Sequence, residues 1–574
     1  MPQLSALIAW TTIFLALGTG GFCSLWVQDQ EKEQPSSVAD SLNLKPGEAA
    51  PDETPPKEEL VKDWDKPDFV LYLSGRLHGY IEPCGCTGLE NQNGGLLRRY
   101  EVLNLLRDRG WNILPIDAGD QVNRLGKQSL VKLQVAYEAM CGLMKYQCIS
   151  FGLSDLKLSA IDLGQAMLNK MVDPDETPFL CANVTVLDES LSKKLRIIES
   201  GGRKILITAV VGAGEIAEIR DDDIKTISPQ KALEQLESQI KGSNAELKVL
   251  ICHASLEESD ALAKQFPIFD VVLTAGGVGD PLFMPELIQT GDHVTRMIQV
   301  GAKGMHVGLV GFWGDKTGAD RIVYERVPLD ARFEDFVNVK DASNLSPIER
   351  LFKSYQDELK SLYEKSPKVL GVNPRKHSSG YSYVGSAVCD DCHDEEFDIW
   401  KDGIDGKGGP HARATKDLTD PGQRTWVARN FDPECLNCHV TGWNVKEFFP
   451  YETGYVDLKK NVHLHGNGCE NCHGPGSQHV GAENGDFPAN EGQLKQFRRE
   501  VRVTMTQVQN GFCTECHDID NSPDFFKENA LNEYWAKIEH GDGIDNVDVD
   551  DAAKGDGEKE GGEKKDGGKG LWCP

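Results

Sequence analysis

Short apolar runs alternate with amphipathic segments between residues 68 and 327. The runs that are typical of strands cover residues 69–74, 112–117, 204–211, 248–253, 271–274, 297–300 and 307–312. Helical spacing of apolar positions covers residues 95–109, 130–144, 229–240 and 257–265. This alternation of strand and helix patterns predicts an α/β layered domain, which we place at residues 67–330.

A different pattern precedes this domain. Residues 4–27 are almost wholly apolar or small, which is long enough to span a bilayer as a helix. No Lys or Arg precedes them, and the bulky Phe22 stands before Cys23. Residues 1–27 are therefore assigned to an uncleaved membrane anchor or a cleaved signal segment, with a lipoprotein site as the third alternative. Residues 28–66, rich in Glu, Pro, Ser and Lys, predict a disordered tether.

The pattern changes again after the α/β domain. Helical spacing at 347–364 indicates a helical linker, which we place at residues 331–380. Residues 381–540 have few strand-like runs and many Gly, Asn and Asp, so an aliphatic core alone cannot hold them together. They are predicted to form a mostly α-helical and irregular domain, followed by a low-complexity tail at 541–574.

The net charge and the cysteine content limit the classes of function that the chain can have. The 574 residues include 61 Lys plus Arg against 90 Asp plus Glu, a formal net charge of -29. Nucleic acid is excluded as a partner because binding it requires a basic surface. The 16 cysteines are too few for a disulfide scaffold of this length and many for a cytosolic enzyme, so their spacing decides the interpretation.

Eight of the cysteines form four copies of Cys-x-x-Cys-His. The copies are Cys389, Cys392 and His393; Cys435, Cys438 and His439; Cys469, Cys472 and His473; and Cys513, Cys516 and His517. Two thiols three positions apart can add to the two vinyl groups of one porphyrin, and the adjacent His then ligates its iron. Zinc sites or redox dithiols could explain one copy, but neither requires the following His in all four. The sequence therefore predicts four covalently bound c-type haems, with these histidines as proximal ligands.

The second axial position of each iron needs another ligand. Six spare histidines of residues 377–540 could supply it: His377, His411, His463, His465, His479 and His540. Four distal ligands would close all four irons and suit electron transfer, whereas an open iron could bind a small molecule. His463 and His465 lie one residue apart, so we expect only one of the two to be a ligand.

Several of these motifs resemble the cytochrome c-554 family of tetrahaem cytochromes. The matching stretches are Tyr383-Val-Gly-Ser-Ala-Val-Cys-Asp-Asp-Cys-His, Trp400, Pro410-His-Ala-Arg-Ala414, Cys438-His-Val-Thr-Gly442 and Cys469-Glu-Asn-Cys-His-Gly-Pro-Gly-Ser-Gln-His479. The resemblance covers residues 381–540 and implies closely packed haems that pass electrons. It also implies that His411, His479 and His540 are distal ligands, and it leaves the fourth between His463 and His465. One haem of that family can be five-coordinate.

The α/β region resembles the calcineurin-like metallophosphoesterases of the 5′-nucleotidase type, which implies an αββα fold. The matching pieces are Leu77-His78-Gly79-Tyr80, Gly94-Gly95-Leu96-Leu97-Arg98-Arg99, Asp117-Ala-Gly-Asp120, Phe179-Leu-Cys-Ala-Asn183 and the strand that ends at His253. Such enzymes hold two metal ions that activate water.

Most of the family's metal ligands are replaced here. Arg76 stands where the family has an Asp, Leu153 and Ser154 replace Asn-His, and Gly277 and Gly279 replace the final two His. His78, Asp120 and His253 remain, and could hold a single metal ion or be polar core residues. A guanidinium at this position repels a divalent cation, so we expect no phosphate ester hydrolysis.

One further cysteine pair, Cys84 and Cys86, follows His78 closely. Their thiols could share a soft metal or act in redox chemistry, form disulfides with other cysteines, or stay free. The most direct hypothesis for the whole chain is an extracytoplasmic (periplasmic), membrane-anchored tetrahaem cytochrome. It would exchange electrons with a partner protein or a quinone-linked donor or acceptor, and its degenerate domain would dock or scaffold. The alternatives are an oxidoreductase acting on a small nitrogen or sulfur compound at an open haem, and a nucleotidase with a remodelled site.

Overall fold

The computed structural model describes residues 60–535 except 84–91, 171–175, 335–344, 404–405, 407, 420–427, 504–506, 509 and 520. The predicted anchor, most of the predicted tether and the predicted tail lie outside these residues. Leu60 and Val61, at the end of the predicted tether, are buried, and Trp64 stacks on Trp111. The folded α/β domain therefore includes these residues and starts before residue 67.

The first of two large sheets has the strand order β13-β12-β1-β2-β3. The strands are β1 (Phe69–Ser74), β2 (Ile113–Asp117), β3 (Cys148–Ile149), β12 (His306–Phe312) and β13 (Ile322–Pro328). β1 and β2 are parallel, as are β2 and β3, whereas β12 is antiparallel to both β1 and β13. Because β1 and β2 run in the same direction, the loops after their carboxyl ends meet at one edge of the sheet.

The second sheet has the order β10-β11-β9-β8-β6-β5. Its strands are β5 (Leu195–Ser200), β6 (Arg203–Val211), β8 (Leu247–His253), β9 (Val271–Thr274), β10 (Glu286–Thr290) and β11 (His293–Gln299). The four central strands β11, β9, β8 and β6 are parallel, and β10 and β5 add antiparallel edges. Strands β4 (Val184–Val186) and β7 (Ile224–Thr226) form a separate short antiparallel pair.

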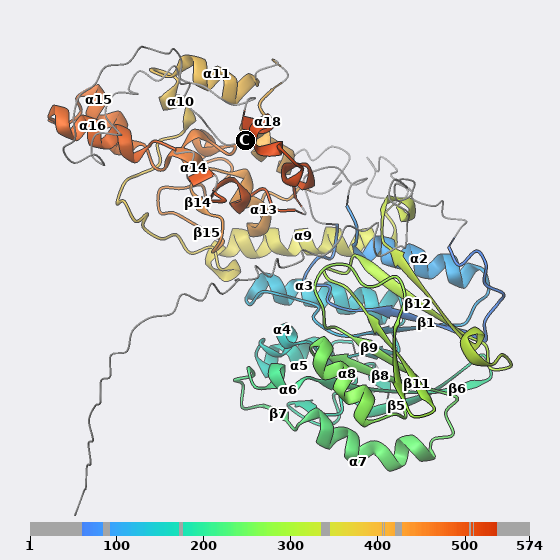
Figure 1. Cartoon of the computed structure of the whole chain (residues 1–574). Coiled ribbons are helices and arrows are strands. Elements are labelled where there is room, and N and C mark those ends of the chain that lie inside the picture. Colours follow the sequence, from blue (N-terminus) through green and yellow to red (C-terminus); the bar gives the residue numbers. More distant parts are fainter. Residues whose placement is uncertain are drawn as a thin grey trace, which may run out of the picture. The chain divides into compact units, whose positions relative to one another are not determined.

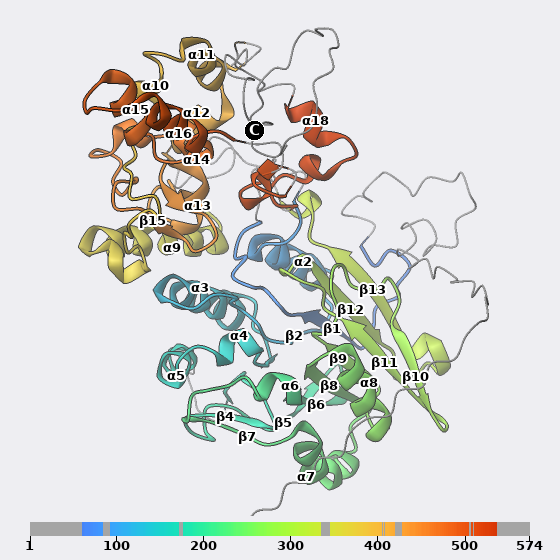
Figure 2. The same cartoon turned by 60° about the vertical axis from the view of Figure 1, so that its left-hand side comes forward.

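Helices cover the outer face of each sheet (Figure 1 and Figure 2). They are α2 (Leu96–Asp108), α3 (Lys127–Tyr137) with a π-helical extension (Glu138–Leu143), α4 (Leu153–Leu156), α5 (Ala160–Leu168), α6 (Ala213–Ile216), α7 (Pro229–Gly242) and α8 (Leu256–Gln265). Alternate residues of β1 separate the layers: Phe69, Leu71 and Leu73 enter the core shared by the two sheets, and Val70 and Tyr72 pack under the helices. The predicted αββα layering is confirmed by this arrangement.

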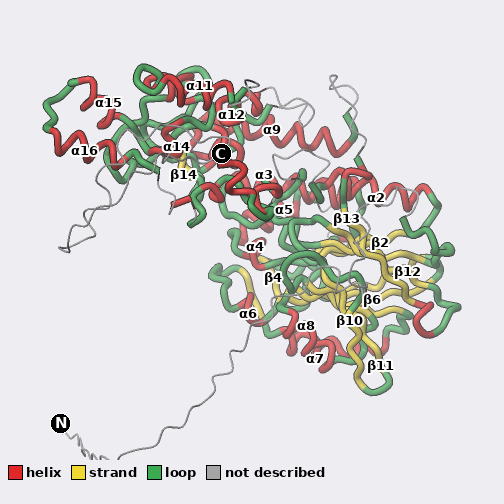
Figure 3. The backbone as a smooth tube through the Cα atoms, turned by 45° about the horizontal axis from the view of Figure 1, so that its top comes forward, coloured by secondary structure: helices red, strands yellow, loops and turns green. Residues whose placement is uncertain are grey.

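The rest of the described chain is helical and irregular, as predicted (Figure 3). Its helices are α9 (Pro347–Lys365), α10 (Ser386–Cys389), α11 (Asp394–Asp402), α12 (Pro410–Thr419), α13 (Pro433–His439), α14 (Cys469–His473), α15 (Ser477–Asn484), α16 (Glu491–Glu500) and α18 (Ala530–Trp535). Two-residue strands β14 (Trp443–Asn444) and β15 (Phe449–Pro450) pair in one hairpin. The helix predicted at 347–364 is α9, which Ser346 begins with a capping box.

Among the described residues, none of the helices combines the length and the apolar character that crossing a membrane requires. The predicted anchor is not among these residues.

Candidate functional site

Each of the four Cys-x-x-Cys-His motifs folds as a helical turn. The second motif lies in α13 and the third is α14. In the first and fourth, the backbone N–H of His393 donates to the Cys389 carbonyl (2.9 Å) and that of His517 to the Cys513 carbonyl (3.0 Å). A helical turn places residues three positions apart on one face, so both thiols of a motif are presented together.

The proximal histidines are oriented through their Nδ1 atoms. Nδ1 of His439 lies 2.8 Å from the Ala414 carbonyl oxygen, and Nδ1 of His517 lies 2.8 Å from Ser522 Oγ. His473 makes the same kind of contact with the Val501 carbonyl, and His393 faces Glu396 at 3.9 Å. An Nδ1 atom that donates to the protein fixes the orientation of the ring, as it does for metal-ligating histidines, so His439, His473 and His517 fit proximal ligation.

Two predicted distal histidines lie opposite proximal ones. The ring centroids of His393 and His479 are 6.4 Å apart, and those of His411 and His517 are 6.0 Å apart. An imidazole centroid lies roughly 3 Å from a metal bound through Nε2, because the metal–nitrogen bond is about 2 Å. Two rings on opposite sides of one iron therefore have centroids roughly 6 Å apart, which both pairs match.

The other candidate distal ligands differ in their surroundings. His465 directs Nε2 to the Leu458 carbonyl at 2.9 Å, which uses the atom that an iron would need. His463 is exposed, and its backbone passes close to Gly385 at the start of α10. His377 directs Nδ1 to Ser379 Oγ, and its ring contacts Tyr451. His540 lies outside the described residues.

The first and third motifs are held together by a buried carboxylate that the sequence did not single out. Glu470, inside the third motif, accepts hydrogen bonds from the backbone N–H groups of Val384, Gly385 and Gly476 at 2.7 to 3.1 Å. The thiols of Cys389 and Cys469 also form a hydrogen bond, which together with burial raises the pKa of Cys389. The first and third motifs therefore adjoin each other, and only the fold reveals it.

The fourth motif carries a competing bond. Cys513 is disulfide-bonded. A thioether to haem at Cys513 requires this thiol to be reduced first.

Three residual phosphoesterase-type side chains meet at the carboxyl-terminal edges of the two sheets. Asp120 Oδ2 lies 3.5 Å from His78 Nε2 and 3.3 Å from His253 Nε2, and the backbone N–H of Ser154 donates to Asp120 Oδ1 at 2.8 Å. His253 also directs Nδ1 to the Ala118 carbonyl at 2.8 Å. Burial lowers the pKa of His253, but the Asp120 carboxylate outweighs it and raises that pKa to about 9. His253 is therefore an imidazolium whose two N–H groups both have acceptors.

Two of the positions at which this chain departs from the phosphoesterase motifs, Arg76 and Gly277, are hydrogen-bonded to each other. The guanidinium of Arg76 donates to the Gly277 carbonyl at 2.8 Å, so the residue in place of an Asp bonds to the residue in place of a His. Arg76, His78 and Asp120 all have positive φ, at 48°, 54° and 62°. Such backbone is costly for residues other than glycine and persists where the surrounding structure enforces it.

A buried residue that sequence reasoning missed organises this loop. Asp155 is completely buried and accepts hydrogen bonds from the backbone N–H groups of Asp120, Gln121 and Gly152 at 2.8 to 3.1 Å. Burial and the nearby Asp120 charge raise the pKa of Asp155 to about 7. Asp155 belongs to no recognisable sequence motif, so nothing in the sequence pointed to its role.

No group of three or more His, Cys, Asp or Glu residues in the described part of the chain is arranged to hold a metal ion. Cys84 and Cys86 lie outside the described residues. Cys148, Cys181 and Cys252 are buried in the α/β domain, and Cys141 is partly buried.

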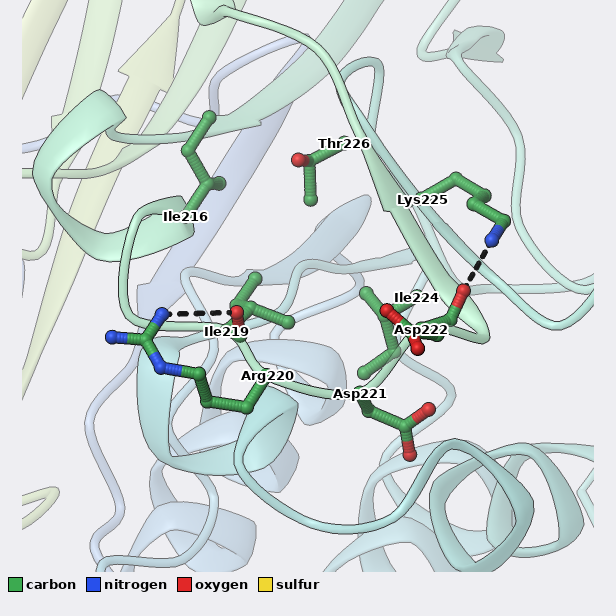
Figure 4. Close-up of a pocket in the computed structure, with 8 residues that line it drawn as sticks. All are labelled: Ile216, Ile219, Arg220, Asp221, Asp222, Ile224, Lys225 and Thr226. Atoms are coloured by element: carbon green, nitrogen blue, oxygen red, sulfur yellow. Dashed lines mark hydrogen bonds between the residues drawn. The ribbon is translucent and has the colours of Figure 1, made fainter.

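A surface cavity of about 250 Å³ lies beside α6 and β7 (Figure 4). The residues that line it are Ile216, Ile219, Arg220, Asp221, Asp222, Ile224, Lys225 and Thr226. Its charged groups bond to neighbouring backbone: Arg220 donates to the Ala217 carbonyl at 2.6 Å, and Asp221 accepts from the N–H groups of Ala160 and Asp223. None of the predicted site residues lines this cavity.

Part of the C-terminal region is similar to known proteins. Residues 388–474 match the family described as cytochrome c554 and c-prime. Cytochrome c-554 of Nitrosomonas europaea is 28% identical over 156 residues, which are 25% of this chain and 60% of that protein. Residues 388–474 thus resemble the c-554 family of c-type cytochromes, as the sequence predicted, and this resemblance implies covalently bound haem.

Solved structures also resemble the α/β half. The 5′-nucleotidase precursor from Thermus thermophilus is 15% identical, with a TM-score of 0.42 over 51% of this chain and 59% of that one. The NAD nucleotidase of Haemophilus influenzae is 20% identical, with a TM-score of 0.39 over 51% of this chain and 56% of that one. At these TM-scores, the assignment of a phosphoesterase-like fold rests on the layers and strand order described above.

Proposed function

We propose that this protein is an extracytoplasmic c-type cytochrome with four haems that passes electrons between redox partners, and that its α/β domain docks or scaffolds without hydrolysing phosphate esters. The haems supply the one-electron chemistry when bound. The chain attaches them through the eight motif cysteines, orients them through the four proximal histidines, and adds distal ligands. A redox protein or a quinone-linked donor or acceptor is the expected partner.

The observation that carries this proposal is the pairing of histidine rings. His393 with His479, and His411 with His517, have the separations that fit one iron between each pair. An iron closed by two imidazoles has no position for a substrate and is suited to electron transfer. His463 is the better candidate for a further distal ligand, because His465 already directs Nε2 to a carbonyl.

The contact between Cys389 and Cys469 supports transfer between neighbouring haems. Both thiols are attachment points, and Glu470 ties their two helices together through buried hydrogen bonds. Haems attached at adjoining thiols lie close together, which outer-sphere electron transfer requires.

The α/β domain offers poor conditions for a metal ion. Arg76 places a cation where the related enzymes have a carboxylate, and its guanidinium donates to the carbonyl of Gly277, which has no side chain to replace their histidine. Asp120, His78 and His253 are therefore proposed to form a cluster, centred on the Asp120 carboxylate, that holds the loops at the edges of the two sheets together.

Spectroscopy of the full-length holoprotein tests the haem proposal. A pyridine haemochrome assay should give four haems per chain, and electron paramagnetic resonance should show low-spin iron with two imidazoles. His411→Ala and His479→Ala should each convert one haem to the high-spin form, whereas His465→Ala serves as the matched control and should convert none. Fewer than four haems, an unchanged spectrum in both variants, or a wild-type high-spin iron that turns over a nitrogen or sulfur compound would overturn the proposal.

A further inference from the structure

The helix that carries the second haem motif is held by charged side chains of the α/β domain. Glu434 immediately precedes Cys435 in α13. Its carboxylate lies 2.6 Å from Lys132 Nζ, on α3, and 3.4 Å from a guanidinium nitrogen of Arg124. The side chain of Lys132 is only 11% exposed and that of Glu434 29%, so water screens this ion pair weakly.

A second carboxylate fixes the start of the same helix. Asp432 is the N-cap of α13 and accepts from the backbone N–H of Glu434 at 2.9 Å. It also accepts from Gln128 on α3 at 2.7 Å, and from Tyr355 and Gln356 on α9 at 3.3 Å each. These bonds hold α13 in one position against α3 and α9.

A third ion pair completes the charge balance around Cys435. Arg429, six residues before Cys435, donates to Glu82 at 2.7 Å. Among the described residues, these contacts place Arg124, Lys132 and Arg429 beside Glu82, Asp432 and Glu434. Lys132 and Arg124 come from the α/β domain.

From this arrangement we infer that the α/β domain sets the reduction potential of the haem attached at Cys435 and Cys438, through the ion pair of Lys132 with Glu434. The inference rests on the proposed function, because it requires that haem to be bound. Lys132 is a positioning residue in this role, because it neutralises the carboxylate next to the attachment site. A degenerate phosphoesterase domain thereby has a use that requires no catalysis.

The direction of the effect follows from charge. An oxidised haem carries one more positive charge than a reduced one, so an unpaired anion nearby stabilises the oxidised form. Lys132→Met leaves Glu434 without its closest cation and should lower one haem potential. Glu434→Gln removes the carboxylate that pairs with Lys132 and Arg124, and should raise it. An uncompensated charge in this weakly screened site should change the oxidation equilibrium about tenfold, which is ~59 mV for one electron.

Spectroelectrochemical titration of the full-length holoprotein measures these potentials. Lys132→Met should lower one of the macroscopic potentials, and Lys132→Arg, which keeps the charge, should restore it. The double variant Lys132→Met/Glu434→Gln should return near the wild-type value, because neither charge remains. Lys170→Met is the matched control, since Lys170 forms a part-buried ion pair with Glu138 inside the α/β domain.

Haem content is measured first, so that a failure of the proposed function can be told apart from a failure of the inference about Lys132. A wild-type protein without haem overturns the proposed function. A Lys132→Met protein that retains its haems and has wild-type potentials overturns the inference alone. So does an equal shift of all potentials, or the same shift in Lys170→Met, because either would report a general disturbance of the fold.

Discussion

Replacing Asp120 by Asn should destabilise the α/β domain without any metal being involved. The substitution keeps the size of the side chain and removes its charge. Burial favours the neutral form of Asp120, but the His253 imidazolium and hydrogen bonds from both histidines outweigh it and hold the pKa of Asp120 below its usual range. The wild-type pair is therefore ionic, and Asp120→Asn leaves a buried imidazolium without its counter-ion.

The magnitude can be worked from His253. Its pKa rises from 6.5 to about 9 in the fold, which is worth about 3 kcal/mol because one pH unit corresponds to about 1.4 kcal/mol. Removing one partner of a buried ion pair costs a similar amount, about 3–5 kcal/mol. For a domain of this size such a loss lowers Tm by roughly 10 °C.

Thermal melting of the full-length holoprotein, followed by circular dichroism at neutral pH, measures this loss. Asp260→Asn is the matched control, because Asp260 pairs with Lys264 at 2.7 Å on the surface of α8 and such pairs contribute about 0–1 kcal/mol. A chelator should leave the wild-type melt unchanged. The reasoning is refuted if the chelator lowers Tm as much as Asp120→Asn does, since a bound metal ion would then be what holds the site.

Two further predictions concern the same edge of the sheets. Because the folded pKa of His253 is raised to about 9, its stabilisation is fully present below pH 6.5 and is lost as the pH rises through 9. Tm should therefore fall between pH 7 and pH 10, and His253→Gln should flatten that decline; equal slopes would contradict the ion pair. Gly119 has φ 88°, and an added Cβ would lie 2.3 Å from the Phe151 carbonyl carbon, so Gly119→Ala should cost at least ~3 kcal/mol in a urea titration. Gly202 is the control, since it has φ 76° and open space around it, and Gly202→Ala should cost only ~1 kcal/mol. Equal losses of stability in the two variants would contradict the predicted steric clash between the added Cβ of residue 119 and Phe151.

The buried strands were predictable, and the edges of the sheets were not. The run at 69–74 is β1 and that at 271–274 is β9, with the same bounds, because these strands are buried along their whole length. All four edge strands, β3, β5, β10 and β13, were missed. β5, β10 and β13 are largely half-buried or exposed, so they carry no continuous apolar run, and β3 has only two residues.

Sequence alone determined the features whose chemistry is local. Each Cys-x-x-Cys-His motif places two thiols and a histidine within five consecutive residues, and the departures from the phosphoesterase motifs are visible at Arg76 and Gly277. Distal ligation, the contact of Cys389 with Cys469, and the charge pair of Lys132 with Glu434 join residues that are far apart in the chain. Only the tertiary structure decides these, because packing brings such groups together, and no spacing in the sequence records which histidine faces which.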